Sequence, residues 1–431
     1  MAGTFYVETL GCPKNEVDSD KLIGVLRSQG LVESDDDTAA DVVVVNTCAF
    51  IEDARRESID TVLALSERRK AGSRLIVTGC MAERYGDELR AHLPEADQIA
   101  GFGVALDVMT AQLPSTPVSI GRKPAVPSFD LLNLPRPASR SPWAYVKIAE
   151  GCDRTCGFCA IPSFRGPQRS RDVDAILREV DELGAKEIVL VAQDLASYGK
   201  DRPDELGAGS IVGLVNAVAA RVPWTRLLYL YPSDLSDELI EAILATGVPY
   251  FDLSLQHVSK PHLRRMRRWG DGERFLRRIA DIRKLAPDAT FRSNFIVGYP
   301  GETEDDHDEL LDFVREAQLD WCGFFSYSRE DGTYAADLPD QVPAGLMNER
   351  IAELRSMQDD ITALRRDALI GATVRVLVDE PGVARSHREA PHIDGVIHVA
   401  ESLAPGEFVD VVIADAYGPD LVAEGGRIDG R

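Results

Sequence analysis

Glu150-Gly-Cys152-Asp-Arg-Thr-Cys156-Gly-Phe-Cys159 is the stretch of this 431-residue chain that decides its fold. Its three thiols stand at the spacing C-x3-C-x2-C, on a loop that leaves a short apolar strand. One tight loop of this kind wraps three corners of an iron-sulfur cubane, because thiolates are the ligands that such clusters use. A zinc knuckle normally closes with a fourth Cys or His, and this loop holds none. The stretch therefore favours a cluster bound by Cys152, Cys156 and Cys159.

The strand before this loop is the first of six that alternate with helices. The expected strands lie roughly at 144–150, 187–193, 226–231, 250–256, 290–298 and 322–328, and the last helix runs from about Pro343 to Ile370. Six parallel strand-helix units predict an open, partial (βα)6 barrel, similar to a TIM barrel that has not closed to eight. Three cysteine ligands leave one iron open, and an amino acid such as S-adenosylmethionine (SAM) can chelate it.

Three further cysteines each end a short β-branched strand early in the chain. These strands are expected at Thr4 to Cys12, Asp41 to Cys48 and Arg74 to Cys80, with helices between them. Such a βαβαβ order gives a parallel sheet, whose ligands sit beyond the carboxyl ends of the strands. A single buried cysteine is ordinary core packing, as we expect for Cys322. Three at consecutive strand ends predict a second three-thiolate site.

Two changes of texture divide the rest of the chain. Frequent prolines between Pro114 and Pro142 break every regular pattern and predict a linker. After Gly371, short β-rich runs broken by Gly and Pro predict a small antiparallel β-barrel. We therefore expect an α/β chain with an N-terminal parallel cluster-binding domain, a Pro-rich linker, a central partial barrel and a C-terminal β-barrel, over 1–113, 114–141, 142–366 and 367–431.

Composition limits the class of protein. Hydrophobic residues make up 44% of the chain, which is enough for packed cores. The sequence shows neither a basic-apolar leader nor an apolar stretch of about 18 residues, so we expect a cytoplasmic protein without a membrane span. Its seven cysteines then stay reduced and serve metal or redox chemistry. A formal net charge of −23 favours a basic protein partner over nucleic acid.

Motifs spread over nearly the whole chain resemble the methylthiotransferase family of radical SAM enzymes. The first domain is similar to the family's cluster-binding domain through Gly11-Cys12-Pro13-Lys14-Asn15, Asn46-Thr47-Cys48 and Thr78-Gly79-Cys80-Met81. The centre resembles its radical domain through the cysteine loop, Leu255-Gln256-His257, Met266-Arg267-Arg268 and Gly298-Tyr299-Pro300-Gly301-Glu302-Thr303. The C-terminal piece looks like a TRAM domain, the small barrel that grips the substrate. Ser254 and Trp269 depart from the family's usual residues.

Other segments resemble one branch of that family, which modifies an aspartate of small-subunit ribosomal protein S-twelve. They are the start Gly-Cys-Pro-Lys-Asn, Ile161-Pro-Ser-Phe-Arg165-Gly and Ala390-Pro-His-Ile-Asp394-Gly395. The tRNA-modifying branch typically begins Gly-Cys-Gln-Met-Asn instead. Charge agrees independently, because Asp367 to Arg431 holds 12 acidic and 5 basic residues, a net charge of −7. Such a surface repels an anticodon loop and attracts a basic ribosomal protein.

The resemblance implies two 4Fe-4S clusters and SAM as cofactors. The loop cysteines would hold the cluster at which SAM yields a radical, which takes hydrogen from the β-carbon of the aspartate. The three N-terminal cysteines would hold the cluster that presents the methylthio group. A reduced flavodoxin- or ferredoxin-type protein is the expected electron donor. Two other hypotheses stay open, namely the same methylthiolation of a tRNA adenosine and a non-catalytic iron-sulfur scaffold.

The same resemblance points to residues that would hold SAM at the barrel mouth. The candidates are Phe158, beside the adenine, and Gln193, Gln256, Arg292, Gly298, Pro300 and Gly301 at strand ends. A polar residue at a strand end often only closes a loop, so both interpretations stay open. His257 is expected to be a satisfied histidine at the mouth rather than a base. The basic run from Arg264 to Arg268, followed by Trp269, fits either a nucleic-acid platform or a solvated helix start.

Overall fold

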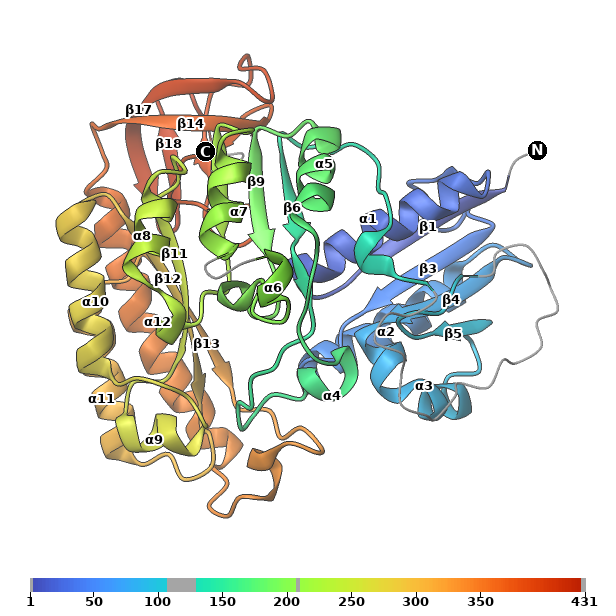
Figure 1. Cartoon of the computed structure of the whole chain (residues 1–431), viewed down its shortest axis with the longest axis horizontal. Helices are drawn as coiled ribbons and strands as arrows, with labels where there is room; N and C mark the ends of the chain where they lie inside the picture. The colour runs from blue at the N-terminus through green and yellow to red at the C-terminus, as the bar shows by residue number, and fades with distance from the viewer. Residues whose placement is uncertain (1–2, 107–128, 207–209, 428–431) are drawn as a thin grey trace. The chain divides into compact units, whose positions relative to one another are not determined.

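The structure is a computed structural model that describes residues 3–106, 129–206 and 210–427. The chain divides into two compact units, whose elements are labelled in Figure 1. Unit 1 consists of Met1–Pro137 and Ala160–Pro167, and unit 2 consists of Ala138–Cys159 and Gln168–Arg431. The segment that follows the cysteine loop in sequence therefore packs in unit 1, while the loop itself belongs to unit 2.

Unit 1 is built on a five-stranded parallel sheet in the order β2-β1-β3-β4-β5. Its elements are β1 (Thr4–Thr9), α1 (Pro13–Ser28), β2 (Val32–Glu33), β3 (Val42–Thr47), α2 (Glu52–Arg68), β4 (Arg74–Gly79), α3 (Cys80–His92), β5 (Gln98–Ala100), the 3-10 turn η1 (Leu131–Asn133) and α4 (Ile161–Arg165). β3 is buried along its whole length, as expected for a run of four valines in the middle of a parallel sheet. The three expected strands are present, and the short edge strands β2 and β5 were not foreseen.

The central part of unit 2 is a partial barrel of six parallel strands. The strands are β6 (Trp143–Lys147), β9 (Glu187–Val191), β10 (Trp224–Leu227), β11 (Tyr250–Gln256), β12 (Thr290–Val297) and β13 (Trp321–Ser326). They form two three-stranded sheets, joined by a parallel bridge between Leu230 and Leu253. β10 ends earlier than expected, because the positive φ of Tyr229 (67°) interrupts the extended backbone. The six parallel strands, each from one strand-helix unit, confirm the expected open (βα)6 architecture.

Helices cover the outside of these strands (Figure 1). The outer helices are α5 (Val173–Leu183), α7 (Ser210–Ala219), α8 (Asp237–Leu244), α10 (Gly272–Leu285), α11 (Glu304–Ala317) and α12 (Ala344–Asp367). The short helices α6 (Pro203–Leu206) and α9 (Lys260–Arg265) lie at the ends of the strands. Short elements complete the unit: β7 (Ala149–Glu150), which pairs with β8 (Arg169–Ser170), and the 3-10 turns η2 (Leu195–Ser197), η3 (Pro232–Asp234) and η4 (Tyr334–Asp337). One continuous apolar core, which includes half-buried Cys322, fills the space between strands and helices.

The C-terminal part of unit 2 is a small closed barrel in the order β14-β15-β16-β18-β17. Its strands are β14 (Thr373–Glu380), β15 (Val383–Arg385), β16 (Ile397–His398), β17 (Phe408–Tyr417) and β18 (Asp420–Ala423). Every pair is antiparallel except the short β16–β18 pair, which runs parallel. Val374, Val376 and Val378 alternate along β14 and face the barrel core, as a period of two requires.

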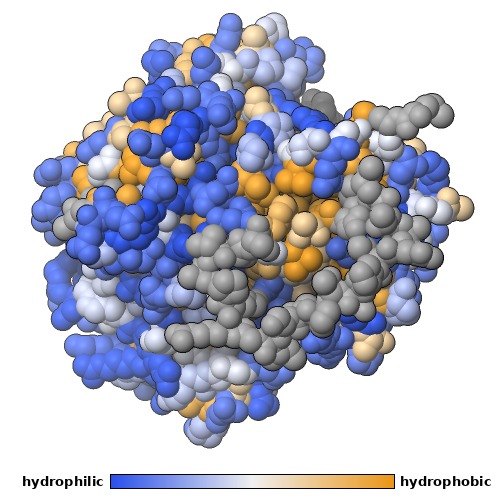
Figure 2. Space-filling model, turned by 45° about the vertical axis from the view of Figure 1, so that its right-hand side comes forward, coloured by the Kyte–Doolittle hydropathy of each residue, from blue (hydrophilic) through white to orange (hydrophobic). Residues whose placement is uncertain are grey.

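Residues 114–128 of the expected linker lie outside the described residues. Among the described residues, no helix has both the length and the hydropathy of a membrane span. Figure 2 shows that hydrophilic side chains cover most of the face it draws, in keeping with a charged fraction of 28%.

Candidate functional site

The three cysteines of unit 1 meet at one edge of its sheet. Cys48 follows β3 directly, Cys80 follows β4 and begins α3, and Cys12 immediately precedes α1. β1, β3 and β4 are neighbours, so their carboxyl ends lie together. Burial, and then the nearby Cys12 and Cys80, raise the pKa of Cys48 to about 12. Burial opposes ionisation of Cys12 as well, but Lys14 and Arg165 outweigh it and lower its pKa. Backbone N–H groups of Lys14 and Asn15 add to this lowering of the Cys12 pKa.

Gly11 lets the Cys48 side chain pack directly against the backbone that precedes Cys12. Its φ is 95°, and a Cβ at this position would lie 2.7 Å from Cys48 Cβ and 2.9 Å from Cys48 Sγ. Asn15 is held beside them, because its Nδ2 donates to the carbonyl oxygens of Leu10 and Thr47 at 2.9 and 3.1 Å. A Cβ on Gly11 would therefore displace the Cys48 side chain. Three thiols gathered at one edge of the sheet are a donor set that fits a three-thiolate cluster.

The cysteine loop of unit 2 follows β7 and is held by backbone hydrogen bonds. The Gly157 N–H donates to the carbonyl of Met266 at 2.8 Å, and the Gly157 carbonyl accepts the Ala335 N–H, also at 2.8 Å. A Cβ on Gly157 would lie 2.6 Å from Tyr299 Oη, so glycine permits this close approach. The first cysteine of the loop is buried and the other two are partly exposed. The donor set again fits a three-thiolate cluster with one accessible side.

Arg268 points into this loop, a contact that the sequence analysis missed. Its Nη1 lies 3.4 Å from Cys156 Sγ, and its Nη2 donates to the carbonyl of Ser254. The guanidinium also lies 4.1 Å from the ring centre of Tyr231. Ser254, which departs from the family's usual residue, contributes its main-chain carbonyl to this contact.

Two other arginines of the basic run are also engaged locally. Arg265 Nη1 donates to the carbonyls of Pro300 and Gly301 at 3.2 and 2.8 Å. The Arg267 guanidinium stacks on Tyr334, 3.8 Å from its ring centre. These contacts tie the run to the site itself and weaken its interpretation as a nucleic-acid platform.

Gln193 presents a buried acceptor near the start of the cysteine loop. Its Nε2 donates to Glu150 Oε1 at 2.7 Å, while Lys147 binds the other oxygen of Glu150 at 2.8 Å. Its own Oε1 is buried and has no hydrogen-bond partner among the described residues. An unsatisfied buried carbonyl costs about 1–3 kcal/mol, so a ligand with an N–H donor, such as the amino group of SAM, fits here. Gln256 ends β11 with φ 73°, and Phe158 packs half-buried against the barrel core.

Arg292 has a different setting from the expected one. It is the third residue of β12, near the start of the strand and far from its carboxyl end. Its Nη1 donates to Asp394 Oδ1 at 2.7 Å, and Tyr250 Oη donates to Asp394 Oδ2 at 2.6 Å. The strand-end placement expected for Arg292 is therefore wrong, because β12 continues for five residues beyond it, and its guanidinium binds Asp394 of the C-terminal part of the chain instead.

The turn from Gly298 to Gly301 is held in place by Glu302. Glu302 Oε2 accepts the Gly298 N–H at 2.6 Å, and Arg350 Nη1 donates to Oε1 at 2.8 Å. Both glycines have positive φ, 81° and 80°, and a Cβ on either would collide with a neighbouring side chain. The backbone of this turn can therefore lie closer to its neighbours than any other residue would allow.

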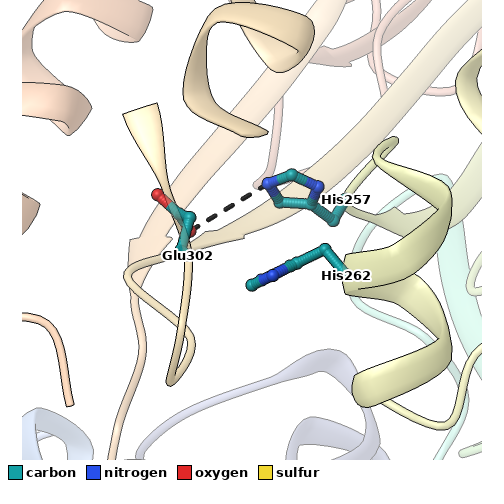
Figure 3. A group of neighbouring side chains, drawn as sticks. All are labelled: His257, His262 and Glu302. Atoms are coloured by element: carbon teal, nitrogen blue, oxygen red, sulfur yellow. Dashed lines mark ion pairs between the residues drawn. The ribbon is translucent and has the colours of Figure 1, made fainter. Parts of the chain in front are cut away.

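Behind the turn, His257 and His262 lie beside Glu302 (Figure 3), and the ligand atoms of the three residues lie within 4.8 Å of one another. His257 Nδ1 accepts the backbone N–H of Ser259 at 3.1 Å, so the proton of the neutral ring is on Nε2. A protonated nitrogen does not ligate a metal, and this one faces Glu302 Oε2 at 4.0 Å. Of these three residues Glu302 alone bonds the turn, whereas His257 Nε2 and both ring nitrogens of His262 are buried without a hydrogen-bond partner among the described residues. The expectation of a satisfied His257 is therefore confirmed for Nδ1 only.

A six-stranded partial barrel with a three-cysteine loop at its mouth defines the radical SAM class of protein. Residues 146–314 match the Radical SAM superfamily, residues 4–101 match the Uncharacterized protein family UPF0004, and residues 370–425 match the TRAM domain. The matches cover the three parts in which the two thiol sites and the small barrel lie.

Curated relatives match the chain over nearly its full length. The ribosomal protein uS12 methylthiotransferase RimO of Saccharopolyspora erythraea is 43% identical over 96% of this chain and 93% of its own. RimO of Moorella thermoacetica is also 43% identical, over 95% of this chain and 96% of its own. A solved structure of the radical SAM methyltransferase TsrM from Kitasatospora setae aligns with 83% of this chain and 89% of its own, with 14% identity and a TM-score of 0.48. The chain belongs to the RimO family of methylthiotransferases.

Proposed function

We propose that this protein adds a methylthio group to the β-carbon of an aspartate in ribosomal protein S-twelve, using two 4Fe-4S clusters and SAM. The observation that carries the proposal is the pair of three-thiol sites, one in each compact unit, in a chain of the RimO family. We assign 1–113 to cluster binding, 114–141 to the linker, 142–366 to the radical core and 367–431 to the TRAM domain.

In unit 2, Cys152, Cys156 and Cys159 would hold the cluster at which SAM would bind. When bound, that cluster supplies the electron that cleaves SAM and thereby the radical that takes hydrogen from an unactivated carbon. Gln193 Oε1 would accept from the amino group of SAM, and the Gly298 to Gly301 turn would close against its ribose or adenine. Phe158 and Gln256 would complete the wall.

In unit 1, Cys12, Cys48 and Cys80 would hold the second cluster, which presents the methylthio group to the substrate. Gly11 permits the close approach of Cys48, and Asn15 bonds the backbone of the loop before Cys12. A reduced flavodoxin- or ferredoxin-type protein would supply the electrons. We place this chemistry in the cytoplasm, where the cysteines stay reduced.

The acidic C-terminal barrel supports a protein substrate over tRNA. Its net charge of −7 attracts a Lys/Arg-rich ribosomal protein and repels the phosphates of an anticodon loop. The internal contacts of Arg265, Arg267 and Arg268 point the same way, because they leave little of the basic run for RNA.

A side-by-side assay tests the substrate. Reduced, anaerobically reconstituted protein is given S-twelve and, separately, tRNA carrying isopentenyladenosine, and both are analysed by mass spectrometry. We expect a methylthio group on one aspartate of S-twelve and unchanged tRNA. Cys152→Ala should abolish both modification and SAM cleavage, whereas Cys12→Ala should abolish modification and still cleave SAM. Modified tRNA with unmodified S-twelve would reject the substrate proposal. Equal loss of cleavage in two folded variants would reject the two-site scheme.

A further inference from the structure

Arg165 contributes a guanidinium to the thiol site of unit 1 from a distant part of the sequence. It ends α4, in the Ala160–Pro167 segment that packs in unit 1. Its Nη2 donates to Cys80 Sγ at 3.0 Å and to Asn15 Oδ1 at 2.9 Å. The contact to sulfur links Arg165 to the proposed cluster, because Cys80 is one of its proposed ligands.

The surroundings hold this guanidinium in one orientation. The Arg165 side chain is only 3% exposed, and its Nη1 lies 3.5 Å from Asp18, whose side chain is 2% exposed. The plane of the guanidinium lies over the ring of Phe102, 4.4 Å from its centre. The salt bridge, the ring contact and the hydrogen bond to Asn15 thus fix the guanidinium so that Nη2 also donates to Cys80 Sγ.

The contact to sulfur is compatible with a metal-bound thiolate. The Cys80 thiol lies 3.6 Å from Asn15 Oδ1, to which it can donate only while it keeps its proton. A metal-bound thiolate is an acceptor only, so it loses that contact and keeps the Arg165 N–H. Hydrogen bonds that involve a charged donor and a charged acceptor are the strong ones.

We propose that Arg165 is a positioning residue of the N-terminal cluster, which donates a hydrogen bond to the Cys80 thiolate and stabilises negative charge on the cluster. The inference rests on the proposed N-terminal cluster. Reduction adds one electron, and the reduced state therefore gains more from the guanidinium than the oxidised state does. Removing Arg165 should make the cluster harder to reduce.

The test uses full-length protein that can assemble only the N-terminal cluster, with Cys152, Cys156 and Cys159 all changed to Ala. Iron content and the midpoint potential, from a redox titration followed by electron paramagnetic resonance, are measured together. Three variants are compared in this background, namely Arg165→Met, Arg165→Lys and Arg165→Met with Asp18→Asn. The double variant removes the buried partner charge along with the arginine. Arg69→Met is the matched control, because Arg69 also pairs with an aspartate of unit 1, Asp97, but at the amino-terminal ends of β4 and β5, opposite the cysteines.

We expect about four irons per chain in all of these proteins. The equilibrium between oxidised and reduced cluster should shift about tenfold or more toward oxidised in the two Met variants, in proportion to a charge-assisted hydrogen bond. Arg165→Lys keeps the positive charge but loses the two-pronged guanidinium, so it should recover part of that shift. Arg69→Met should leave the potential unchanged. A potential unchanged in iron-loaded Met variants overturns the inference and leaves the proposed function standing. Iron lost from all three Arg165 variants also overturns it, because Arg165 would then be needed for assembly. No iron in the background protein, with Arg165 intact, instead rejects the N-terminal cluster itself.

Discussion

Gly11 shows how a residue without a side chain lets Cys12 and Cys48, two proposed cluster ligands, lie close together. The residue precedes Cys12 with φ 95°, which an L side chain rarely adopts. A Cβ there would overlap both Cβ and Sγ of Cys48. Glycine is therefore required at this position for two independent reasons, the positive φ and the lack of space for a Cβ.

Gly11→Ala should remove the N-terminal cluster and leave the other. We expect iron in the reconstituted protein to fall from about eight to about four atoms per chain, because each three-thiolate site holds one cubane. Iron and acid-labile sulfide are measured on the purified variant. Gly86→Ala is the control, because a Cβ at Gly86 meets open space in the same unit. A Gly11→Ala protein with its full iron content would contradict the steric argument.

At the level of elements, the chain after β11, the helix α9 and the turn after β12 bring two buried histidines beside the buried carboxylate of Glu302. His257 and His262 are both buried, and burial lowers the pKa of His257 well below its usual range and that of His262 to about 4. Both rings therefore stay neutral in the folded protein at pH values where an unfolded histidine, with a pKa near 6.5, is already charged.

The two buried histidines should lower the free energy of unfolding in weak acid. The folded pKa of His262 is lower than the unfolded one, so the unfolded state binds more protons and stability falls as pH drops from about 6.5 toward 4. Between pH 7 and pH 5 His262 alone should cost about 2 kcal/mol. Urea unfolding of metal-free protein at the two pH values measures it. Burial raises the pKa of Glu302, which acts in the opposite direction, so His262→Gln is the control. If that variant kept the same pH dependence, His262 would not be its source.

At the scale of the whole of unit 2, the C-terminal barrel docks on the amino-terminal ends of the central strands. Glu187, the first residue of β9, binds Arg226 Nε at 2.7 Å and Arg385 Nη1 at 2.8 Å, and Arg385 also pairs with Asp379. Trp321, the first residue of β13, donates through Nε1 to a carbonyl of the C-terminal segment at 2.7 Å. The cysteine loop lies at the other end of these strands, so the small barrel and the proposed radical site occupy opposite ends of the core.

Glu187→Gln should loosen this docking. The carboxylate, Arg226 and Arg385 are all buried, and removing one partner leaves a buried cation uncompensated, at a cost of about 3–5 kcal/mol. We therefore expect unfolding at a lower urea concentration. Tryptophan fluorescence measures it, because Trp143, Trp224 and Trp321 all lie at this interface. Glu273→Gln is the control, since its exposed pair on α10 should contribute less than about 1 kcal/mol. Equal midpoints for the two variants would contradict the role assigned to the buried network.

The sequence by itself determined the class of fold and the two sets of thiols. The spacing of Cys152, Cys156 and Cys159 is a local property of one loop. The convergence of Cys12, Cys48 and Cys80 follows from the rule that consecutive parallel strands end at one edge. Hydrophobic periodicity likewise placed the six barrel strands to within a few residues, because it reflects local burial.

Only the tertiary structure decided which arginines serve these sites. Arg165 is 85 residues from Cys80, Arg268 is 112 residues from Cys156, and Arg292 is 102 residues from Asp394. In the sequence, Arg165 was part of a family likeness, Arg268 part of a basic run and Arg292 an expected SAM contact. No local pattern reports where a long, charged side chain finds its partner. Its position is set by packing between distant segments, and the cost of burying an unpaired guanidinium then selects the carboxylate, carbonyl or sulfur that it reaches.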